Sequence, residues 1–444
     1  MKKISLILFL CIIAFSILRA EDKSVIKLIP VYEKTFQDTI VDVIFDTATV
    51  SITKAKEMGW KDDAFNEEEK RIGNAIISYS CVLITKDKIS FFNKEGKEKR
   101  IVKRIVEGIK WEGKEGIHIG RGRIHVRKSK NGEYLALAIP REGSSLGEGE
   151  KGDLVIYRKD GQEMWRVENV YLSDGIITPS PNGEYAIALP PGEYPEQPPF
   201  YYSKEGLIKL IPKEWNGKWV YPFYPGIPSF SYAGEYFTIP INSDGDSTFF
   251  LKFNQNKQLW WKTIEGKIYS IKISNTGKYI VVSSESTTKC FNINGEILWK
   301  RKPCSSIFSF DKNDDLLVLA YSRKGKIECL NSVTGEIMWA FEDKSLMKKS
   351  TLIEINIKDS KIIVIGKLWQ YMPPKGAECI CILSANGKVL FKEFLSSNFL
   401  TKTYFDSEGA NKGAHLSQDG RYIIFSPYTG NIRIVKYFSS RGEK

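Results

Sequence analysis

The stretch Ser129-Lys130-Asn131-Gly132-Glu133-Tyr134 decides the fold, together with the apolar run 135–138 that follows it. A serine hydroxyl accepts hydrogen bonds from the amides of a tight turn, and glycine tolerates the positive φ that such a turn requires. An uninterrupted apolar run after the tyrosine is typical of a strand that is covered on both faces. The stretch therefore predicts a hairpin whose second strand begins at Tyr134.

The same pattern returns along the chain, and this repetition is the strongest signal in the sequence. Further clear copies start at Ser180, Ser231, Ser274 and Ser417. The first four copies are 51, 51 and 43 residues apart, and degenerate copies at 311–316 and 357–362 fill the gap before the last one. Repeats of this length predict a series of small sheets of about four strands each.

A second motif follows these hairpins and combines a turn with an aromatic residue. Its copies are Asp160–Trp165, Asn294–Trp299, Thr334–Trp339 and Asn386–Phe391, with Asn256–Trp260 as a variant that lacks glycine. Asn-Gly and Asp-Gly are the preferred corners of two-residue hairpins. We expect the aromatic side chain, four residues after the glycine, to pack between adjacent sheets.

The two motifs mark the second, third and fourth strands of a repeating unit. They predict an all-β fold: a single eight-bladed β-propeller of four-stranded blades, with seven blades as the alternative. The last repeat shows only three strands, at 414–437, so we expect the N-terminal stretch 26–32 to supply the fourth and close the ring.

The chain then divides into four parts. They are a signal peptide (1–20), an N-terminal segment with the ring-closing strand (21–75), the propeller (76–437) and a C-terminal tail (438–444). Within the N-terminal segment, residues 67–71 are typical of a short helix or of a loop.

The first motif resembles the repeats of TolB-like propellers, and the second resembles the repeats of pyrroloquinoline-quinone (PQQ)-like and WD-type propellers. The resemblance covers roughly residues 76–437. The residues that carry it are turn and packing residues, and such repeats serve many roles. The resemblance therefore implies an architecture and assigns no functional residue.

The N-terminus has the composition of a secretory signal. Lys2 and Lys3 precede an apolar run at 4–18, and Ala20 offers a cleavage site before a polar stretch. An uncleaved anchor is the alternative, although a membrane span needs about 20 apolar residues. We expect an exported protein, periplasmic or extracellular. After cleavage it should be monomeric, and either soluble or peripheral at an envelope surface.

Positive charge is concentrated in one part of the chain. The net charge of +12 falls to +9 without Lys2, Lys3 and Arg19, and residues 94–130 hold 13 Lys or Arg against five Glu. If 121–127 is one strand, then its alternate residues share a face; these are Arg121, Arg123, His125 and Arg127. That face is either a patch for an anionic partner or a solvated blade edge. Export argues against a nucleic-acid partner.

Six cysteines remain after cleavage, which permits disulfides in an exported protein. However, Cys290, Cys329 and Cys381 lie at matching points before glycine turns, which favours packed thiols. Cys290 and Cys304 form the most plausible disulfide if one is present.

No constellation in the sequence predicts catalysis. Quinone-dependent dehydrogenases share the second repeat, but the Cys-Cys pair that the resemblance implies for many of them is missing. Asn242, Asp244 and Asp246 are typical either of a calcium loop or of a polar hairpin. Residues 143–147 match the letters of a nucleophile elbow but lead into a charged loop. We predict no catalytic residue, no cofactor and no metal site.

The remaining outliers are three loops rich in proline and aromatic residues, at 190–202, 215–228 and 369–374. They are either binding surfaces or small satellite cores. The second loop contains four candidate anchors for a partner, Trp215, Trp219, Tyr221 and Tyr224. Arg121, Arg123 and Arg127 add an electrostatic rim to this candidate binding surface.

These observations favour a non-enzymatic binding or assembly module of the cell envelope or extracellular space that recognises a protein or a polysaccharide. The alternative is an exported propeller enzyme, either a quinone-dependent oxidoreductase or a glycan-directed hydrolase or lyase.

Overall fold

The computed structural model describes most of the chain as β-strands. The described residues are 27–35, 40–85, 87–103, 105–113, 116–140, 151–171, 176–189, 200–209, 214–215, 218–222, 228–243, 247–254, 257–266, 268–302, 307–321, 326–343, 351–358, 361–367, 378–395, 414–416, 422–425 and 431–438.

Three four-stranded antiparallel sheets come first along the chain, each with its strands in sequence order. They consist of β2 (Ile40–Ser51), β3 (Asn74–Thr85), β4 (Lys88–Phe92) and β5 (Glu98–Lys103); of β8 (His125–Lys128), β9 (Tyr134–Pro140), β10 (Lys151–Arg158) and β11 (Glu163–Tyr171); and of β12 (Ile176–Pro179), β13 (Tyr185–Leu189), β14 (Phe200–Ser203) and β15 (Gly206–Lys209). A two-stranded hairpin, β6 (Ile105–Gly113) and β7 (Gly116–Arg123), is inserted between the first and the second sheet.

The fourth sheet in chain order has six strands. They are β16 (Glu214–Trp215), β17 (Lys218–Pro222), β18 (Ser229–Phe230), β19 (Tyr236–Ser243), β20 (Ser247–Asn254) and β21 (Lys257–Glu265). Strand β18 pairs with the first half of β19, and β17 pairs with its last residues. Strands β18 to β21 thus repeat the order of the four-stranded sheets, and the β16–β17 hairpin is added to the same edge.

Four more four-stranded sheets complete the chain. Three of them consist of β22 (Ile268–Ile273), β23 (Ile280–Ser284), β24 (Thr288–Phe291) and β25 (Ile297–Arg301); of β26 (Ile307–Phe310), β27 (Leu316–Tyr321), β28 (Lys326–Asn331) and β29 (Ile337–Glu342); and of β30 (Thr351–Lys358), β31 (Lys361–Lys367), β32 (Glu378–Ser384) and β33 (Val389–Leu395). The last sheet joins both ends of the chain and consists of β34 (Ala414–Leu416), β35 (Tyr422–Phe425), β36 (Asn431–Phe438) and β1 (Lys27–Thr35). In it, β1 pairs antiparallel with β36 and overlaps residues 26–32, for which the sequence predicted this role.

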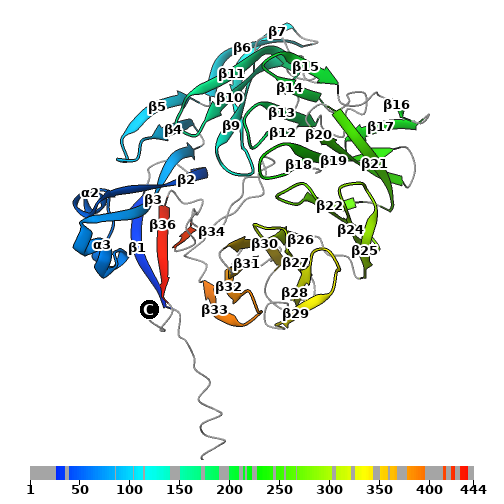
Figure 1. Ribbon diagram of the computed structural model, residues 1–444. Helices are drawn as coiled ribbons and strands as arrows, with labels where there is room; N and C mark the ends of the chain where they lie inside the picture. The colour runs from blue at the N-terminus through cyan, green and yellow to red at the C-terminus, as the bar shows by residue number, and fades with distance from the viewer. Residues whose placement is uncertain are drawn as a thin grey trace, which may run out of the picture.

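The sheets follow one another around a common centre, from blue through green to orange, and red β36 lies beside blue β1 (Figure 1). The fourth strands, such as β5, β25 and β29, lie at the periphery of the ring (Figure 1). Four-stranded antiparallel sheets arranged in this way form a β-propeller. The predicted fold class is therefore confirmed at the level of architecture.

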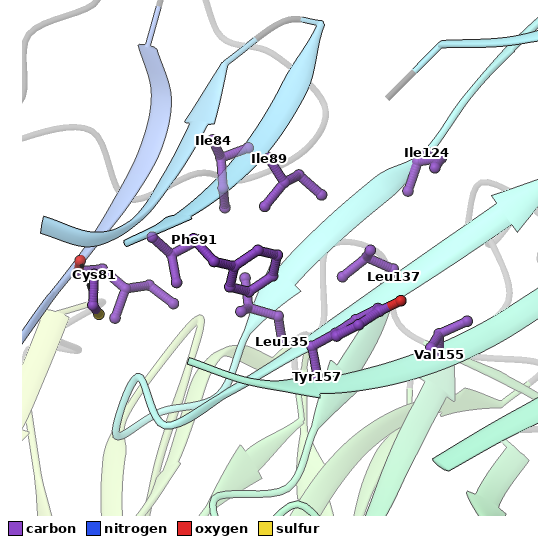
Figure 2. Close-up of a cluster of buried hydrophobic side chains, with 11 residues drawn as sticks. Cys81, Ile84, Ile89, Phe91, Ile124, Leu135, Leu137, Val155 and Tyr157 are labelled. Atoms are coloured by element: carbon purple, nitrogen blue, oxygen red, sulfur yellow. Dashed lines mark hydrogen bonds between the residues drawn. The ribbon is translucent and has the colours of Figure 1, made fainter. Parts of the chain in front are cut away.

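The apolar core lies between the sheets. Leu135 and Leu137 of β9 pack against the preceding sheet, where Phe91 belongs to the same cluster (Figure 2). Ala136 and Ala138 of the same strand pack against the following sheet. This two-sided burial is the reason that the run 135–138 is apolar without alternation.

A helical insertion separates β2 from β3. It contains α2 (Ile52–Glu57), the 3-10 helix η1 (Asp62–Ala64) and α3 (Glu67–Ile72). Asn66 caps α3 in a reciprocal capping box with Glu69, and Gly73 ends it with a φ of 76°. Trp60 and Phe65 are buried against β2 and β3. The first sheet therefore contains β2 and this insertion, which the sequence placed in the separate segment 21–75.

Candidate binding surface

The two ends of the ring are built differently. In every sheet the first and third strands finish, and the second and fourth strands start, at the same end, because neighbouring strands are antiparallel. We call this the turn end, and 129–133 is one of its turns. The connections from the second to the third strand and from one sheet to the next start and finish at the opposite end, the loop end.

The first motif forms the inner turns of the turn end, as predicted. The backbone N–H of Tyr134 donates to Ser129 Oγ at 3.0 Å, and Ser129 N–H donates to the Tyr134 carbonyl at 2.8 Å. Gly132 has a φ of 74°. The turns that begin at Ser180, Ser231 and Ser274 repeat the bond between tyrosine N–H and serine Oγ at 3.0–3.2 Å.

Hydrogen bonds also link these turns from sheet to sheet. Asn131 Nδ2 donates to the Pro181 carbonyl at 2.8 Å, and Tyr232 N–H donates to the Asn275 carbonyl at 2.7 Å. Packing is equally close, because a Cβ at Gly277 would overlap the ring of Tyr236 in the preceding sheet. The inner part of the turn end is therefore a continuous, interlocked surface across these sheets.

The second motif joins neighbouring sheets at the outer part of the turn end. The predicted packing of its aromatic residues between adjacent sheets is confirmed. Trp299 is 8% exposed, and its indole N–H donates to the Ser332 carbonyl of the next sheet at 2.9 Å. Trp339 donates in the same way to the Ala385 carbonyl at 2.6 Å. In the first sheet Arg100 takes the tryptophan's place and donates to the Gly161 carbonyl at 3.0 Å.

The residue that pairs with each of these tryptophans on the neighbouring third strand shows which cysteines occupy equivalent positions in different sheets. Cys290 pairs with Trp299 and Cys329 with Trp339, whereas Cys381 pairs with Lys392. Cys381 is thus displaced by one residue from the predicted matching point. Cys81, Cys290, Cys329 and Cys381 are all free and buried, and burial raises the pKa of Cys290 to about 12. A Cys290–Cys304 disulfide is therefore not present, and Cys304 lies outside the described residues.

Lys252 occupies this position in the six-stranded sheet and is fully buried opposite Trp260. Its ammonium donates to the Gly277 carbonyl at 2.9 Å and lies 4.8 Å from the centre of the Tyr236 ring. Within the described part of the chain, no carboxylate pairs with it. Burial lowers the pKa of Lys252 to about 8. No sequence motif marks this lysine.

Two further lysines, also missed by sequence reasoning, lie on inner elements. Lys130 Nζ donates to the Phe230 carbonyl at 2.8 Å, and Lys272 Nζ donates to the Phe308 carbonyl at 3.0 Å. Both acceptors belong to first strands of other sheets, β18 and β26.

The candidate aromatic residues of the second loop lie in the β16–β17 hairpin at the loop end. Trp215 pairs with Lys218 and Trp219 with Glu214, so the two tryptophans are not cross-strand neighbours. Tyr221 pairs with Asn242 and joins the hairpin to β19. Tyr224 lies outside the described residues.

The basic candidates do not lie on a single strand. Arg121 and Arg123 belong to β7, where they pair with Glu107 and Ile105. Arg127 belongs to β8, the first strand of another sheet, and is half-buried. Ile124, which is 3% exposed, separates the two strands. The shared face required 121–127 to be one continuous strand, and this condition is not met, because the hairpin ends where the second sheet begins.

Part of the first aromatic loop is core. Phe200, Tyr201 and Tyr202 form the strand β14 and are at most 7% exposed. The loop interpretation fails for these three residues. Tyr194 and the loop at 369–374 lie outside the described residues.

Potential metal ligands are dispersed among the described residues. Among them, no three His, Cys, Asp or Glu side chains gather closely enough to hold a metal ion. Asp244, Asp246 and the stretch 143–147 lie outside the described residues. None of the helices in the described part of the chain has both the length and the apolar content of a membrane span.

The sequence matches no protein-family model and no curated protein. Among solved structures, BamB from Moraxella catarrhalis is similar with 11% identity and a TM-score of 0.46, covering 92% of this chain and 100% of that chain. Hydrazine synthase from Kuenenia stuttgartiensis has 14% identity and a TM-score of 0.38, covering 56% and 72%. A eukaryotic initiation factor has 11% identity and a TM-score of 0.40, covering 71% and 84%.

Proposed function

We propose that the protein is an exported, non-enzymatic binding module that holds a protein partner at the loop end. One observation carries this proposal. The turn end is interlocked from sheet to sheet, and the helical insertion 52–73 at this end buries Trp60 and Phe65 against its own sheet, whereas both inserted hairpins, β6–β7 and β16–β17, start and finish at the loop end. Additions to a rigid scaffold are where recognition commonly resides.

The composition of the two hairpins supports a protein as the partner. Trp215, Trp219 and Tyr221 lie in one hairpin, and Arg121 and Arg123 in the other. Tryptophan, tyrosine and arginine are the residue types that dominate the energetics of protein interfaces. A polysaccharide is the alternative ligand that the experiment below distinguishes.

The scaffold of this proposal is a ring of eight blades. The seven four-stranded sheets supply seven of them, and strands β18 to β21, which have the same order, supply the eighth. The apolar run 4–18 behind Lys2 and Lys3 supports export. A mature protein that begins at Glu21 when isolated from the native host is the expected outcome, and a retained residue 1 contradicts cleavage.

Site-specific photo-crosslinking in the native host tests the surface. A photoreactive amino acid replaces Trp219 or Arg123 at the loop end, and Val333 or Ile337, each 47% exposed, serves as the control at the turn end. We expect one protein to be captured from both loop-end positions and not from the controls. Equal capture at both ends overturns the proposal, and an adduct that resists protease but not glycosidase identifies a polysaccharide instead.

A further inference from the structure

Exposed aliphatic side chains gather along one arc of the turn end, away from the proposed partner surface. Among the described residues, half of the large apolar side chains that are exposed lie at the start of four successive fourth strands, β21, β25, β29 and β33, or in the turns before them. Strands β25, β29 and β33 follow one another along the periphery of the ring (Figure 1). We call these seven residues the apolar arc, and each is 38–57% exposed: Leu259, Ile293, Ile297, Val333, Ile337, Met338 and Val389.

Hydrogen bonds hold the arc together from sheet to sheet. Trp260 Nε1 donates to the Ile293 carbonyl at 2.7 Å, so β21 contacts the turn of the following sheet that contains Ile293. Trp299 reaches the Ser332 carbonyl, beside Val333, and the tryptophan of β29 repeats this bond one sheet further. Because these turns occupy the same place in each sheet, the arc lies at one end of the ring. A flat surface at this end therefore contacts all four sheets at once.

The N-terminal segment joins the ring at this same end. Strand β1 is a fourth strand, and Lys27 pairs with Phe438, the last residue of β36, so β1 starts at the turn end. Residues 21–26 separate β1 from the signal segment 1–20, and six extended residues reach about 22 Å at most. While residues 1–20 are in a membrane, as the proposed export requires, the turn end is held close to that membrane.

Charges of both signs accompany the arc. The exposed Lys257 and Lys300 lie on its strands, and the exposed Glu296 and Glu336 lie in its turns. Electrostatic attraction of one sign is therefore weak here, and burial of aliphatic surface supplies the favourable free energy of a contact. The occupant that this composition favours is an apolar medium with a polar boundary, in which long lysine side chains extend their ammonium groups to the polar side.

We infer that the apolar arc lies on a lipid bilayer and inserts its side chains at the boundary between headgroups and acyl chains. Apolar side chains of peripheral proteins enter this boundary to a depth of roughly 5–10 Å. The protein is then peripheral to the membrane, with the loop end and its proposed partner surface turned away from the lipid. This inference rests on the export that the proposed function includes, but not on the partner.

Sedimentation with vesicles of phosphatidylcholine and phosphatidylglycerol tests the arc. The mature chain 21–444 is used, because the apolar run 4–18 would bind lipid by itself. We expect binding that persists in about 0.5 M NaCl, which screens exposed charges. Ile337→Ser combined with Met338→Ser should weaken it about tenfold or more, because two aliphatic contacts are lost.

Two controls are matched to these variants. Tyr269→Ser replaces a side chain that is 53% exposed in β22, near the start of this strand at the loop end, and should leave vesicle binding unchanged. Trp219→Ala with Tyr221→Ala must also leave it unchanged, which separates the arc from the proposed partner surface.

A photoreactive amino acid gives a second readout in case the serine variants do not fold. At Ile337 it should form adducts with vesicle lipid, whereas at Trp219 it should form none. Absence of vesicle binding, loss of binding in high salt, or equal weakening by Tyr269→Ser would overturn the inference. A dimer that Ile337→Ser with Met338→Ser disperses, detected by light scattering, would assign the arc to a second copy of the chain and overturn it as well.

Discussion

Asp314 holds the turn that contains Thr276 in the preceding sheet. Its Oδ2 accepts hydrogen bonds from the Thr276 N–H at 2.8 Å and from the Thr276 hydroxyl at 2.5 Å, while Oδ1 accepts from the Asn275 N–H at 2.7 Å. Asp314 stands where the other turns have glycine and adopts a φ of 66°. Aspartate tolerates this left-handed conformation better than most residues. In this degenerate copy of the motif, aspartate replaces the turn glycine, and its carboxylate binds the turn of the preceding sheet.

Two replacements of Asp314 separate the effect of its hydrogen bonds from the effect of its left-handed backbone conformation. Asp314→Gly keeps the backbone relaxed but loses the hydrogen bonds, so we expect a loss of about 1–3 kcal/mol in unfolding free energy. Asp314→Ala adds the left-handed strain of about 1–2 kcal/mol. Denaturant unfolding measures both, with Asp315→Ala at the exposed neighbouring position as the control. Equal stability of the Gly and Ala variants would contradict the assigned strain.

The aromatic residues of the second motif should be structural. Trp299→Ala removes a buried ring and its bond to Ser332, and we expect a cost of about 3–5 kcal/mol. Ile297→Ala on the same strand is the control, because Ile297 is 55% exposed. Thermal and denaturant unfolding report the difference. A cost below about 1 kcal/mol for both Trp299→Ala and Trp339→Ala would contradict the packing between sheets.

These two residues show what the sequence reveals and what it does not. Trp299 was predictable because its role is local and repeated: a turn glycine at a fixed distance precedes an aromatic residue in several blades. The spacing also located the turn 311–316. The function of Asp314 in that turn depends on a contact with Thr276, 38 residues away in the chain, and no local pattern records such a contact.

The candidate surface was less predictable for a related reason. Alternation predicts one face for 121–127 only if the strand is continuous, and the start of a new sheet near Ile124 depends on pairing partners elsewhere. Phe200 to Tyr202 appeared to be part of a loop because prolines precede them, yet pairing with β13 makes them core.

Lys252 should make stability depend on pH. Burial lowers its pKa in the folded protein to about 8, below the ordinary lysine value of 10.5, so the unfolded chain binds more protons between these values. Stability contributed by this site therefore rises with pH across that window, by at most ~1.4 kcal/mol per pH unit. The cost of burying the charge is present in full below pH 8. Lys252→Met should abolish this rise.

The measurement is the difference in unfolding free energy between wild type and Lys252→Met from pH 7 to pH 10. Buried thiols such as Cys290 titrate in both proteins and cancel in the difference. Lys257→Met, at an exposed position at the start of β21, is the control. A difference that stays constant with pH would show that folding does not lower the pKa of Lys252.

Closure of the ring depends on β1. Deletion of residues 21–35 removes the partner of β36 and exposes an unpaired strand edge, so we expect a sharp fall in melting temperature or aggregation. Deletion of 21–25, which precede β1, is the matched control. Calorimetry and size-exclusion chromatography provide the readouts. A truncated protein that remains monomeric with unchanged melting would contradict the closure.

The last prediction decides between recognition and packing at the β16–β17 hairpin. Trp219 and Tyr221 lie in β17, which reaches the propeller through three backbone pairs with β19. If these aromatic residues bind a partner, then replacing both with alanine should abolish photo-crosslinking from a probe at position Arg123. The melting temperature should then stay within about 2 °C of the wild-type value, which corresponds to a surface change of ~0.5 kcal/mol in unfolding free energy. Loss of several kcal/mol instead would assign them to a satellite core. Phe237→Ala, a buried residue of β19, marks the size of that structural effect. A variant that retains both crosslinking and stability would remove this hairpin from the binding surface and leave the β6–β7 hairpin as its remaining part.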